Sequence, residues 1–306
     1  MSVLYLEVSS KKIHFFKILL SIRLGTSKYI TQRNNMKNEI VKKILLPVIV
    51  LFVIIQLWNG LAHIVENLPT PSDTYVAAFG GVTSDGDELE GVLTNPFYIN
   101  NEDDKGLFWQ VAESLKRVFG GFALAILAGI PFGILIGMSK NAQYAFEPII
   151  QILKPVSPLA WLPLFLLIFQ DINFTAIATI FVTSIWPIII NTALGVKNVN
   201  QDYMNVAKVL RFTPMEQVFK IILPVAVPYM FTGMRLSLGI AWIVIVAAEM
   251  LTGGIGIGFW IWDEYNNLNY PNIIIGIIIV GVVGWILDMI MNQISNYFDY
   301  TKKGRV

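Results

Sequence analysis

The sequence predicts an all-α integral membrane protein with six transmembrane helices, and three observations support this fold class. The chain of 306 residues is 55% hydrophobic and only 14% charged, whereas a soluble domain carries about 25% charged residues. It contains six apolar stretches close to the roughly 20 residues that a helix needs to cross the hydrocarbon core. Lys and Arg are also spread unevenly among the connections, which is how membrane topology is encoded.

The predicted helices follow one another along the chain as residues 44–62, 119–138, 148–169, 174–194, 230–251 and 273–291. The third contains Lys154 and three prolines, Pro155, Pro158 and Pro163. Proline in a membrane helix frees backbone groups that protein or water must satisfy. We therefore expect the third helix to be broken and packed inside the bundle.

The positive charges predict that both termini are cytoplasmic. Residues 1–43 hold nine Lys and Arg, the 196–224 connection holds four, and the tail 300–306 holds three. The 63–106 connection holds one basic residue and nine acids, and 252–272 holds no basic residue. Because cytoplasmic segments carry the excess of Lys and Arg, we expect 196–224 to be cytoplasmic and 63–106 to be an extracytoplasmic acidic loop.

The first 35 residues have two interpretations. "HFFKILLSIRL" is interrupted by Lys17 and Arg23, and no small-residue cleavage site follows, so a signal peptide is not predicted. "MKNEIVKK" places a methionine and a short basic stretch directly before the first helix. Either Met36 is the initiator and 1–35 an upstream extension, or 1–43 is a basic tail held at the membrane surface.

Three further patterns concern helix ends and packing. Residues 107–121 are amphipathic and are expected to lie at the outer interface. Gly129, Gly133 and Gly137 repeat every four residues, which favours close helix approach. "GGIGIG", residues 253–258, predicts a flexible break after the fifth helix.

Residues 200–222 predict two short amphipathic helices outside the membrane. Asn200 is a typical N-cap, and Thr213, Pro214 and Glu216 form the pattern of a capping box. The apolar positions recur at intervals of three and four, as on one face of a helix. Such a surface either fits a groove on a partner or folds back on its own bundle.

The segment "NVAKVLR…IILP" in this connection resembles the cytoplasmic coupling loop of binding-protein-dependent ABC import permeases. That family carries Glu-Ala-Ala, a Gly four residues after the second Ala, and then Ile-x-Leu-Pro. Matches to this pattern are Ala207, Ile221, Leu223 and Pro224, while Asn205 and Val206 replace Glu and the first Ala. Arg211 replaces the Gly, which disfavours the usual tight turn.

Longer segments between about residues 108 and 299, including "SPLAWLP" and "FVTSIWPIIINTA", resemble permeases of the nitrate and bicarbonate importers. The sulfonate and taurine branch is less similar. The resemblance implies a type I ABC importer permease fold with a core over 107–299, in the bacterial plasma (inner) membrane. It further implies import of a small anion, most of all nitrate, with bicarbonate or sulfonate and taurine as alternatives.

The resemblance also implies partners and coupling residues. The partners are a second permease copy, extracytoplasmic substrate-binding protein, and cytoplasmic ABC ATPase subunits that use ATP and Mg²⁺. The residues expected to couple this chain to the ATPases are Asn205, Val206, Ala207, Arg211, Thr213, Glu216, Ile221, Leu223 and Pro224.

Several function classes lack support in the sequence. It has no G-x-x-x-x-G-K-[ST], H-E-x-x-H or G-x-S-x-G motif, no cysteine, and two distant histidines. No catalytic residue, cofactor or metal is therefore expected in this chain, and its net charge of +1 does not favour nucleic acid. An ATP-independent secondary transporter or channel remains the alternative, although it would usually show an internal repeat and mid-membrane coupling residues.

Ionisable residues inside predicted helices are the candidates for the translocation path: Lys154, Arg235 and Glu249. Lys154 and Arg235 either lower the barrier for an anion by Coulomb attraction or extend toward the cytoplasmic interface. Glu249 would repel an anion if it were ionised in the path. We expect it to be protonated or hydrogen-bonded across helices.

Overall fold

A computed structural model of the chain describes residues 41–82, 88–101 and 105–298. The basic segment that contains Met36 and the tail 300–306 lie outside the described residues. The chain separates into two units, Met1–Pro71 and Ser72–Val306. The first unit contains the apolar helix Val41–Ala62, which begins three residues before the predicted first span. After it, the Trp58 indole N–H donates to the Pro69 carbonyl over 3.0 Å.

The second unit opens with a small extramembrane part. Helix α2 (Pro71–Phe79) is followed by strands β1 (Gly81–Val82) and β2 (Glu88–Leu89). The two strands pair antiparallel, with Gly81 opposite Leu89. Ala77 and Ala78 of α2 pack against Ile275, which fixes this part to the last helix of the bundle.

Helices make up the rest of the second unit. They are α3 (Leu107–Met138), α4 (Lys140–Leu153), α5 (Pro158–Phe169), α6 (Ile172–Lys197), α7 (Gln201–Val209), α8 (Pro214–Gln217), the π-helix η1 (Val218–Ile222), α9 (Leu223–Thr252), α10 (Ile257–Asn266) and α11 (Tyr270–Phe298). Among the described residues of the whole chain, five helices are long and apolar enough to cross a membrane, or six if α4 and α5 form one bent span. The all-α membrane fold class is thereby confirmed.

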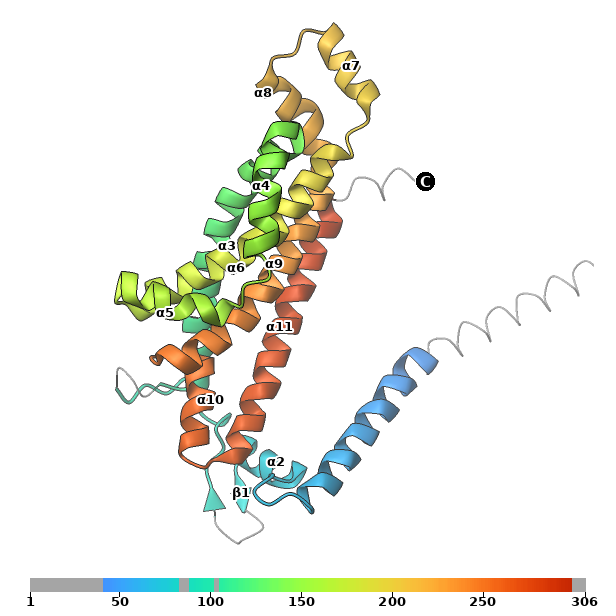
Figure 1. Ribbon diagram of the computed structural model, residues 1–306. Helices are drawn as coiled ribbons and strands as arrows, with labels where there is room; N and C mark the ends of the chain where they lie inside the picture. Colours follow the sequence, from blue (N-terminus) through green and yellow to red (C-terminus); the bar gives the residue numbers. More distant parts are fainter. Residues whose placement is uncertain (1–40, 83–87, 102–104, 299–306) are drawn as a thin grey trace, which may run out of the picture. The chain divides into compact units, whose positions relative to one another are not determined.

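Helix α6 lies in the centre of the bundle, between α3 and α9, and α11 packs on α9 (Figure 1). The contact between α3 and α6 depends on the glycines that the sequence singled out. A Cβ atom on Gly133 would lie 2.5 Å from Thr192 Cβ, and one on Gly137 would lie 2.5 Å from Val196 Cβ. The predicted close approach is confirmed, because only a residue without a side chain fits at these distances.

The third predicted helix, 148–169, differs most from the structure. Helix α4 already begins at Lys140, and the chain bends by 96° between α4 and α5. Ser157 has the extended φ of −57° and ψ of 134° that a residue before proline prefers, and Pro158 starts α5. The expected break is present, but the expected packing inside the bundle is wrong for the isolated chain: none of the described α4 residues is buried, and only Leu162 of α5 is.

Two predicted spans are parts of longer helices, because neighbouring segments continue into them without a break. The expected interfacial segment 107–121 is the first half of α3, a single helix of 32 residues. Helices α8, η1 and α9 form one helical stretch of 39 residues, Pro214–Thr252. At 1.5 Å per residue it is about 58 Å long, roughly twice the 30 Å hydrocarbon core. It is therefore longer than one crossing of the membrane requires.

Candidate functional site

The predicted helix pair projects from one end of the bundle (Figure 1). Helix α7 starts where the sequence predicts, because the Asn200 side chain accepts a hydrogen bond from the Asp202 N–H at 2.9 Å. Asp202 also places a negative charge in the first turn, where the helix dipole favours it. Asn205 is exposed and accepts a hydrogen bond from the Gln201 side chain at 3.4 Å, and Ala207 is fully buried.

The turn between α7 and α8 forms although a glycine is absent. Arg211 has a φ of 53°, the left-handed conformation for which glycine is usually selected. The Arg211 N–H bonds to the Lys208 carbonyl at 3.0 Å, and the Phe212 N–H bonds to the Ala207 carbonyl at 2.9 Å. These are the two hydrogen bonds of a Schellman motif. The tight turn therefore forms without the glycine, with Arg211 in the left-handed conformation.

The predicted capping box at the start of α8 is present. The Thr213 hydroxyl accepts from the Glu216 N–H at 3.3 Å, and the Glu216 carboxylate accepts from the Thr213 N–H at 2.9 Å. Lys220 donates to the same carboxylate at 2.9 Å. These hydrogen bonds, first from Lys220 and then from Thr213, lower the pKa of Glu216 to about 2. The carboxylate outside the membrane is therefore ionised near neutral pH.

A π-helical turn joins α8 to α9. The Leu223 N–H bonds to the Val218 carbonyl, five residues back. The wider turn immediately precedes Pro224, which has no N–H to donate and would clash with a carbonyl in a regular helix. The three matched residues Ile221, Leu223 and Pro224 therefore lie in a continuous stalk between α8 and the membrane, rather than in a loop.

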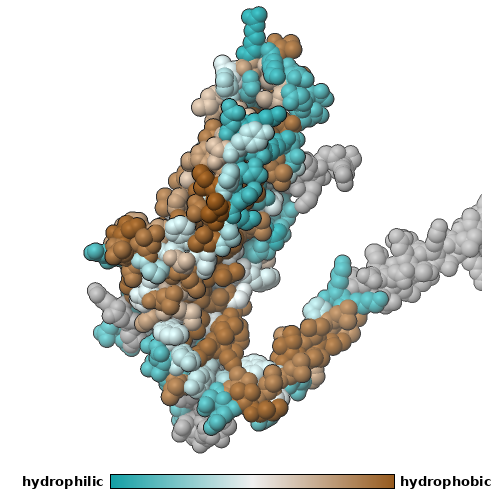
Figure 2. Space-filling view, viewed as in Figure 1, coloured by the Kyte–Doolittle hydropathy of each residue, from teal (hydrophilic) through white to brown (hydrophobic). Residues whose placement is uncertain are grey.

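Large apolar side chains are exposed along α7, the turn that follows it, α8 and η1. We call them the apolar ridge; its members are between 55% and 81% exposed and are Tyr203, Val206, Val209, Leu210, Met215 and Phe219. Hydrophilic residues otherwise gather over this end (Figure 2). Contiguous exposed apolar surface in a polar setting marks an interaction site.

At the opposite end of the bundle, Glu249 is fully buried and paired. Arg117 Nη1 lies 2.7 Å from its carboxylate, with side chains that are 7% and 0% exposed. The Ser114 hydroxyl donates to the same carboxylate at 2.8 Å, and the Gly258 N–H donates at 3.1 Å. Glu249 thus faces the interior of the bundle, where its charge is matched by a cation and further donors.

This ion pair also holds the loop that connects α9 to α10. Arg117 donates to the Ile255 carbonyl at 2.6 Å, and the Gln110 side chain accepts from the Gly256 N–H at 2.7 Å. A Cβ atom on Gly256 would overlap the Glu249 carboxyl group. The predicted flexible break at 253–258 is therefore tied down on α3, and we call Gln110, Ser114, Arg117 and Glu249 the buried clamp.

Sequence reasoning missed three of the four clamp residues. Gln110, Ser114 and Arg117 are spaced four and three residues apart, so they lie on one helical face. That polar stripe was visible, but 107–121 was interpreted as an interfacial segment whose polar face meets water. Its partner Glu249 lies 132 residues from Arg117, so local pattern did not reveal the pair.

The two remaining intramembrane candidates differ from each other. Arg235 makes a two-pronged ion pair with Asp288, at 2.6 and 2.7 Å, and donates to Asn292 at 3.1 Å. Its charge is balanced within the chain. Lys154 caps α4 through its backbone N–H, which bonds to the Ile150 carbonyl at 2.9 Å, but its side chain has no hydrogen bond or ion pair among the described residues. The structure therefore does not bring Lys154, Arg235 and Glu249 together in one site.

Comparisons with known proteins agree with this architecture. The family described as "Binding-protein-dependent transport system inner membrane component" matches residues 129–303, more than half of the chain. Nitrate import permease protein NrtB of Leptolyngbya laminosa is 51% identical over 205 residues, which are 67% of this chain and 74% of the relative. Bicarbonate transport system permease protein CmpB of Synechocystis sp. is 49% identical over 198 residues, 64% of this chain and 71% of the relative.

A solved structure is similar in fold. A chain of the MetNI methionine ABC transporter, in an inward-facing crystal form, superposes with a TM-score of 0.54 at 17% identity and covers 63% of this chain and 95% of that chain. At this identity the likeness concerns the fold alone. Together with the family match over the bundle and the stalk, it shows that this chain belongs to the inner membrane component family of binding-protein-dependent transport systems, as an ABC importer permease.

Proposed function

We propose that this chain is the permease subunit of an ATP-driven, binding-protein-dependent importer of a small anion, with nitrate as its substrate. Two copies form the membrane channel, an extracytoplasmic binding protein delivers the anion, and cytoplasmic ABC ATPases bind ATP and Mg²⁺. Both termini and the α7–α8 end face the cytoplasm. The chain itself carries out no covalent chemistry.

The observation that carries the proposal is the apolar ridge on a rigid support. Six large apolar side chains are exposed along α7, α8 and η1. An amphipathic helix with such a face can bind in a groove on a partner. Glu216 and Thr213 close the capping box, and the helix continues from α8 through η1 into α9. A displacement of the ridge by an ATPase is therefore transmitted into the bundle without an intervening loop.

The matched coupling residues have different roles in this proposal. Val206 and Arg211 are exposed and contact the ATPase, with Asn205 taking the place of the family's Glu. Ala207 is buried, and its carbonyl accepts from the Phe212 N–H, so it supports the turn between α7 and α8. Thr213 and Glu216 fix the start of α8, while Ile221, Leu223 and Pro224 form the stalk that moves with it.

The choice of substrate rests on the relatives. The nitrate permease and the bicarbonate permease are almost equally similar to this chain, and both names refer to small monovalent anions. Nitrate is the first choice because the match to the nitrate permease is both slightly closer and slightly longer. Bicarbonate is the alternative, and the sulfonate and taurine branch comes after it.

The test is uptake into proteoliposomes that contain this chain, its ATPases and its binding protein. Labelled nitrate, bicarbonate and taurine are compared, with and without ATP on the ATPase side. Nitrate uptake that requires both ATP and the binding protein is the expected result. Uptake without ATP would instead support a secondary transporter or channel, and ATP-driven uptake of bicarbonate alone would overturn the substrate.

A further inference from the structure

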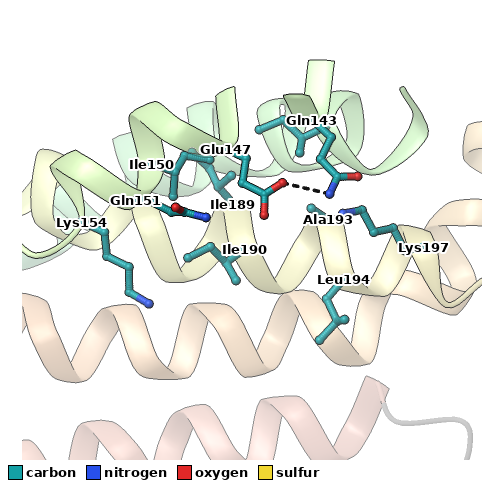
Figure 3. A pocket seen from close by; sticks show the side chains of 11 residues that line it. Gln143, Glu147, Ile150, Gln151, Lys154, Ile189, Ile190, Ala193, Leu194 and Lys197 are labelled. Atoms are coloured by element: carbon teal, nitrogen blue, oxygen red, sulfur yellow. Dashed lines mark hydrogen bonds between the residues drawn. The ribbon is translucent and has the colours of Figure 1, made fainter. Parts of the chain in front are cut away.

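A groove between α4 and α6 has a composition that the packing of the bundle does not explain. It encloses a cavity of about 340 Å³. Lys154 lies at one end and Lys197 at the other, with Glu147 between them on the α4 side (Figure 3). Apolar residues of α6, Ile189 and Ile190 among them, form the floor. Since one water occupies about 30 Å³, the groove has room for a small anion and several waters.

The polar residues of α4 form a single stripe. Gln143, Glu147, Gln151 and Lys154 are spaced four, four and three residues apart, so they point to one side of the helix. All four line the groove. Polar and ionised side chains at membrane depth face a water-filled cavity rather than lipid. The stripe therefore borders an aqueous space, although α4 lies on the surface of the isolated chain.

The charges in the groove are not balanced internally. Among the described residues, neither Lys154 nor Lys197 takes part in an ion pair. Glu147 accepts a hydrogen bond from Gln143 at 3.0 Å and is likewise not paired with a cation there. This contrasts with Arg117 and Arg235, whose partners are Glu249 and Asp288. Two lysines and one glutamate leave the groove with a net charge of +1.

We propose that the groove holds the transported anion on its way through the membrane, with Lys154 and Lys197 as its two cationic contacts. The inference rests on the proposed function and assigns its path. The two lysines lie at opposite ends of the groove (Figure 3). Gln143, which lines the Lys197 end, is eleven residues, or about 16 Å, from Lys154 along α4. An anion attracted to one lysine therefore reaches the other by moving along the groove.

The net charge of +1 explains why the groove would let a monovalent anion pass through and would not retain it. A monovalent anion neutralises the groove, so it enters favourably. Glu147 limits the attraction, because transport needs binding that is favourable enough to enter and weak enough to leave. The same balance selects against divalent anions, which would leave the loaded groove with a net negative charge in a low-dielectric setting.

The decisive variant is Lys154→Gln in the complete importer, with nitrate uptake and ATP hydrolysis measured in the same proteoliposomes. We expect nitrate imported per ATP hydrolysed to fall at least roughly tenfold, because the variant removes a direct charge contact in a medium of intermediate dielectric constant. Hydrolysis stimulated by the binding protein should persist. Lys154→Arg should restore the ratio. Lys116→Gln, an exposed lysine of α3 outside the groove, is the matched control and should leave it unchanged.

Glu147→Gln tests the charge balance by removing the negative charge of the groove. The groove then carries +2 and retains the anion, so maximal uptake should fall. Inhibition by sulfate on the ATPase side should strengthen several-fold, because a divalent anion now matches the groove. Unchanged uptake and unchanged sulfate inhibition in this variant would contradict the role of Glu147.

Two outcomes for Lys154→Gln would overturn the inference. One is an unchanged ratio of uptake to hydrolysis. The other is a parallel loss of both activities, or loss of copurifying ATPase, which would place Lys154 in coupling or assembly. If wild-type vesicles import no nitrate with ATP and binding protein, the proposed substrate fails, and the same variants are compared on bicarbonate, another monovalent anion.

Discussion

The two ends of the bundle differ in which side chains they bury and which they expose. At the α10 end, the charged pair Arg117 and Glu249 is buried and hydrogen-bonded within the chain. At the α7–α8 end, apolar side chains such as Leu210 and Phe219 are 58% and 63% exposed. One end satisfies its polar groups internally, whereas the other leaves its apolar surface uncovered.

The two ends differ in whether their side chains are satisfied within the chain or require a partner. A buried ion pair with further donors holds α3, α6, α9 and the 253–258 loop together, since Arg117 also donates to Asn173 at 2.8 Å. An exposed apolar ridge contributes no such stability to its own chain and acquires a role only when a partner covers it. Helix α9 connects the two ends, so a movement imposed at the ridge meets a rigid clamp at the far side.

The largest effect should come from breaking the clamp. Glu249→Ala leaves the Arg117 charge buried without a partner, which typically costs about 3–5 kcal/mol of unfolding free energy. Denaturant unfolding of the purified chain in detergent measures it. Glu113→Ala removes an exposed carboxylate of α3 that pairs with Lys116, and this matched control should change stability by less than about 1 kcal/mol.

A second variant sharpens the interpretation of the clamp. Replacing both charges, in Arg117→Leu with Glu249→Leu, removes the unpaired charge, so the double variant should lose less stability than Glu249→Ala alone. If the double variant loses as much stability as the single variants Arg117→Leu and Glu249→Leu lose together, a direct pairing of the two side chains is contradicted. If Glu249→Gln leaves assembly and uptake unchanged, the charge of Glu249 has no role in transport.

The ridge should show the opposite behaviour. Phe219→Ser should leave the stability of the isolated chain nearly unchanged but weaken binding of the ATPase subunits by roughly 2 kcal/mol, the size of an interface hot spot. Pull-down titration with purified ATPase measures the affinity. Leu268→Ser, at a 67% exposed leucine of the opposite end, is the control. If Phe219→Ser and Leu268→Ser bind the ATPase with equal affinity, the apolar ridge is not part of the interface.

The cap of α8 should have a smaller effect. Thr213→Ala removes one half of the capping box and should lower stability by about 1 kcal/mol. Glu216→Gln keeps a side chain that can accept from the Thr213 N–H, so it should lose less. Both are measured by denaturant unfolding. If Glu216→Gln proves the more damaging of the two, the ion pair with Lys220 matters more than the cap.

The smallest expected change is a gain. Arg211→Gly places a residue without a Cβ atom at a position with left-handed backbone conformation. Because glycine adopts this conformation without a steric cost, the variant should stabilise the chain by about 0.5–1 kcal/mol. Arg211→Ala keeps the unfavourable conformation and should bring no gain. A loss of stability in Arg211→Gly would show that the arginine side chain contributes more than its backbone costs.

Local features of the chain were predictable from the sequence because they depend on neighbouring residues. The capping box of Thr213 and Glu216 spans four residues, and the glycines that let α3 approach α6 recur at a helical interval. The apolar length of each span is likewise a property of a continuous segment. Such patterns act through backbone geometry and solvation, so the composition of one segment is sufficient to predict them.

The membrane class, the long apolar helices and the helix caps could be predicted from the sequence, since each is set by short-range hydrogen bonding or by transfer of an apolar segment into lipid. Tertiary structure alone decided which charges meet. Arg117 and Glu249 are 132 residues apart, and Arg235 and Asp288 are 53 apart. It also decided that Lys154 has no such partner among the described residues. The energy of an ion pair depends on distance and burial in three dimensions, which sequence spacing does not contain.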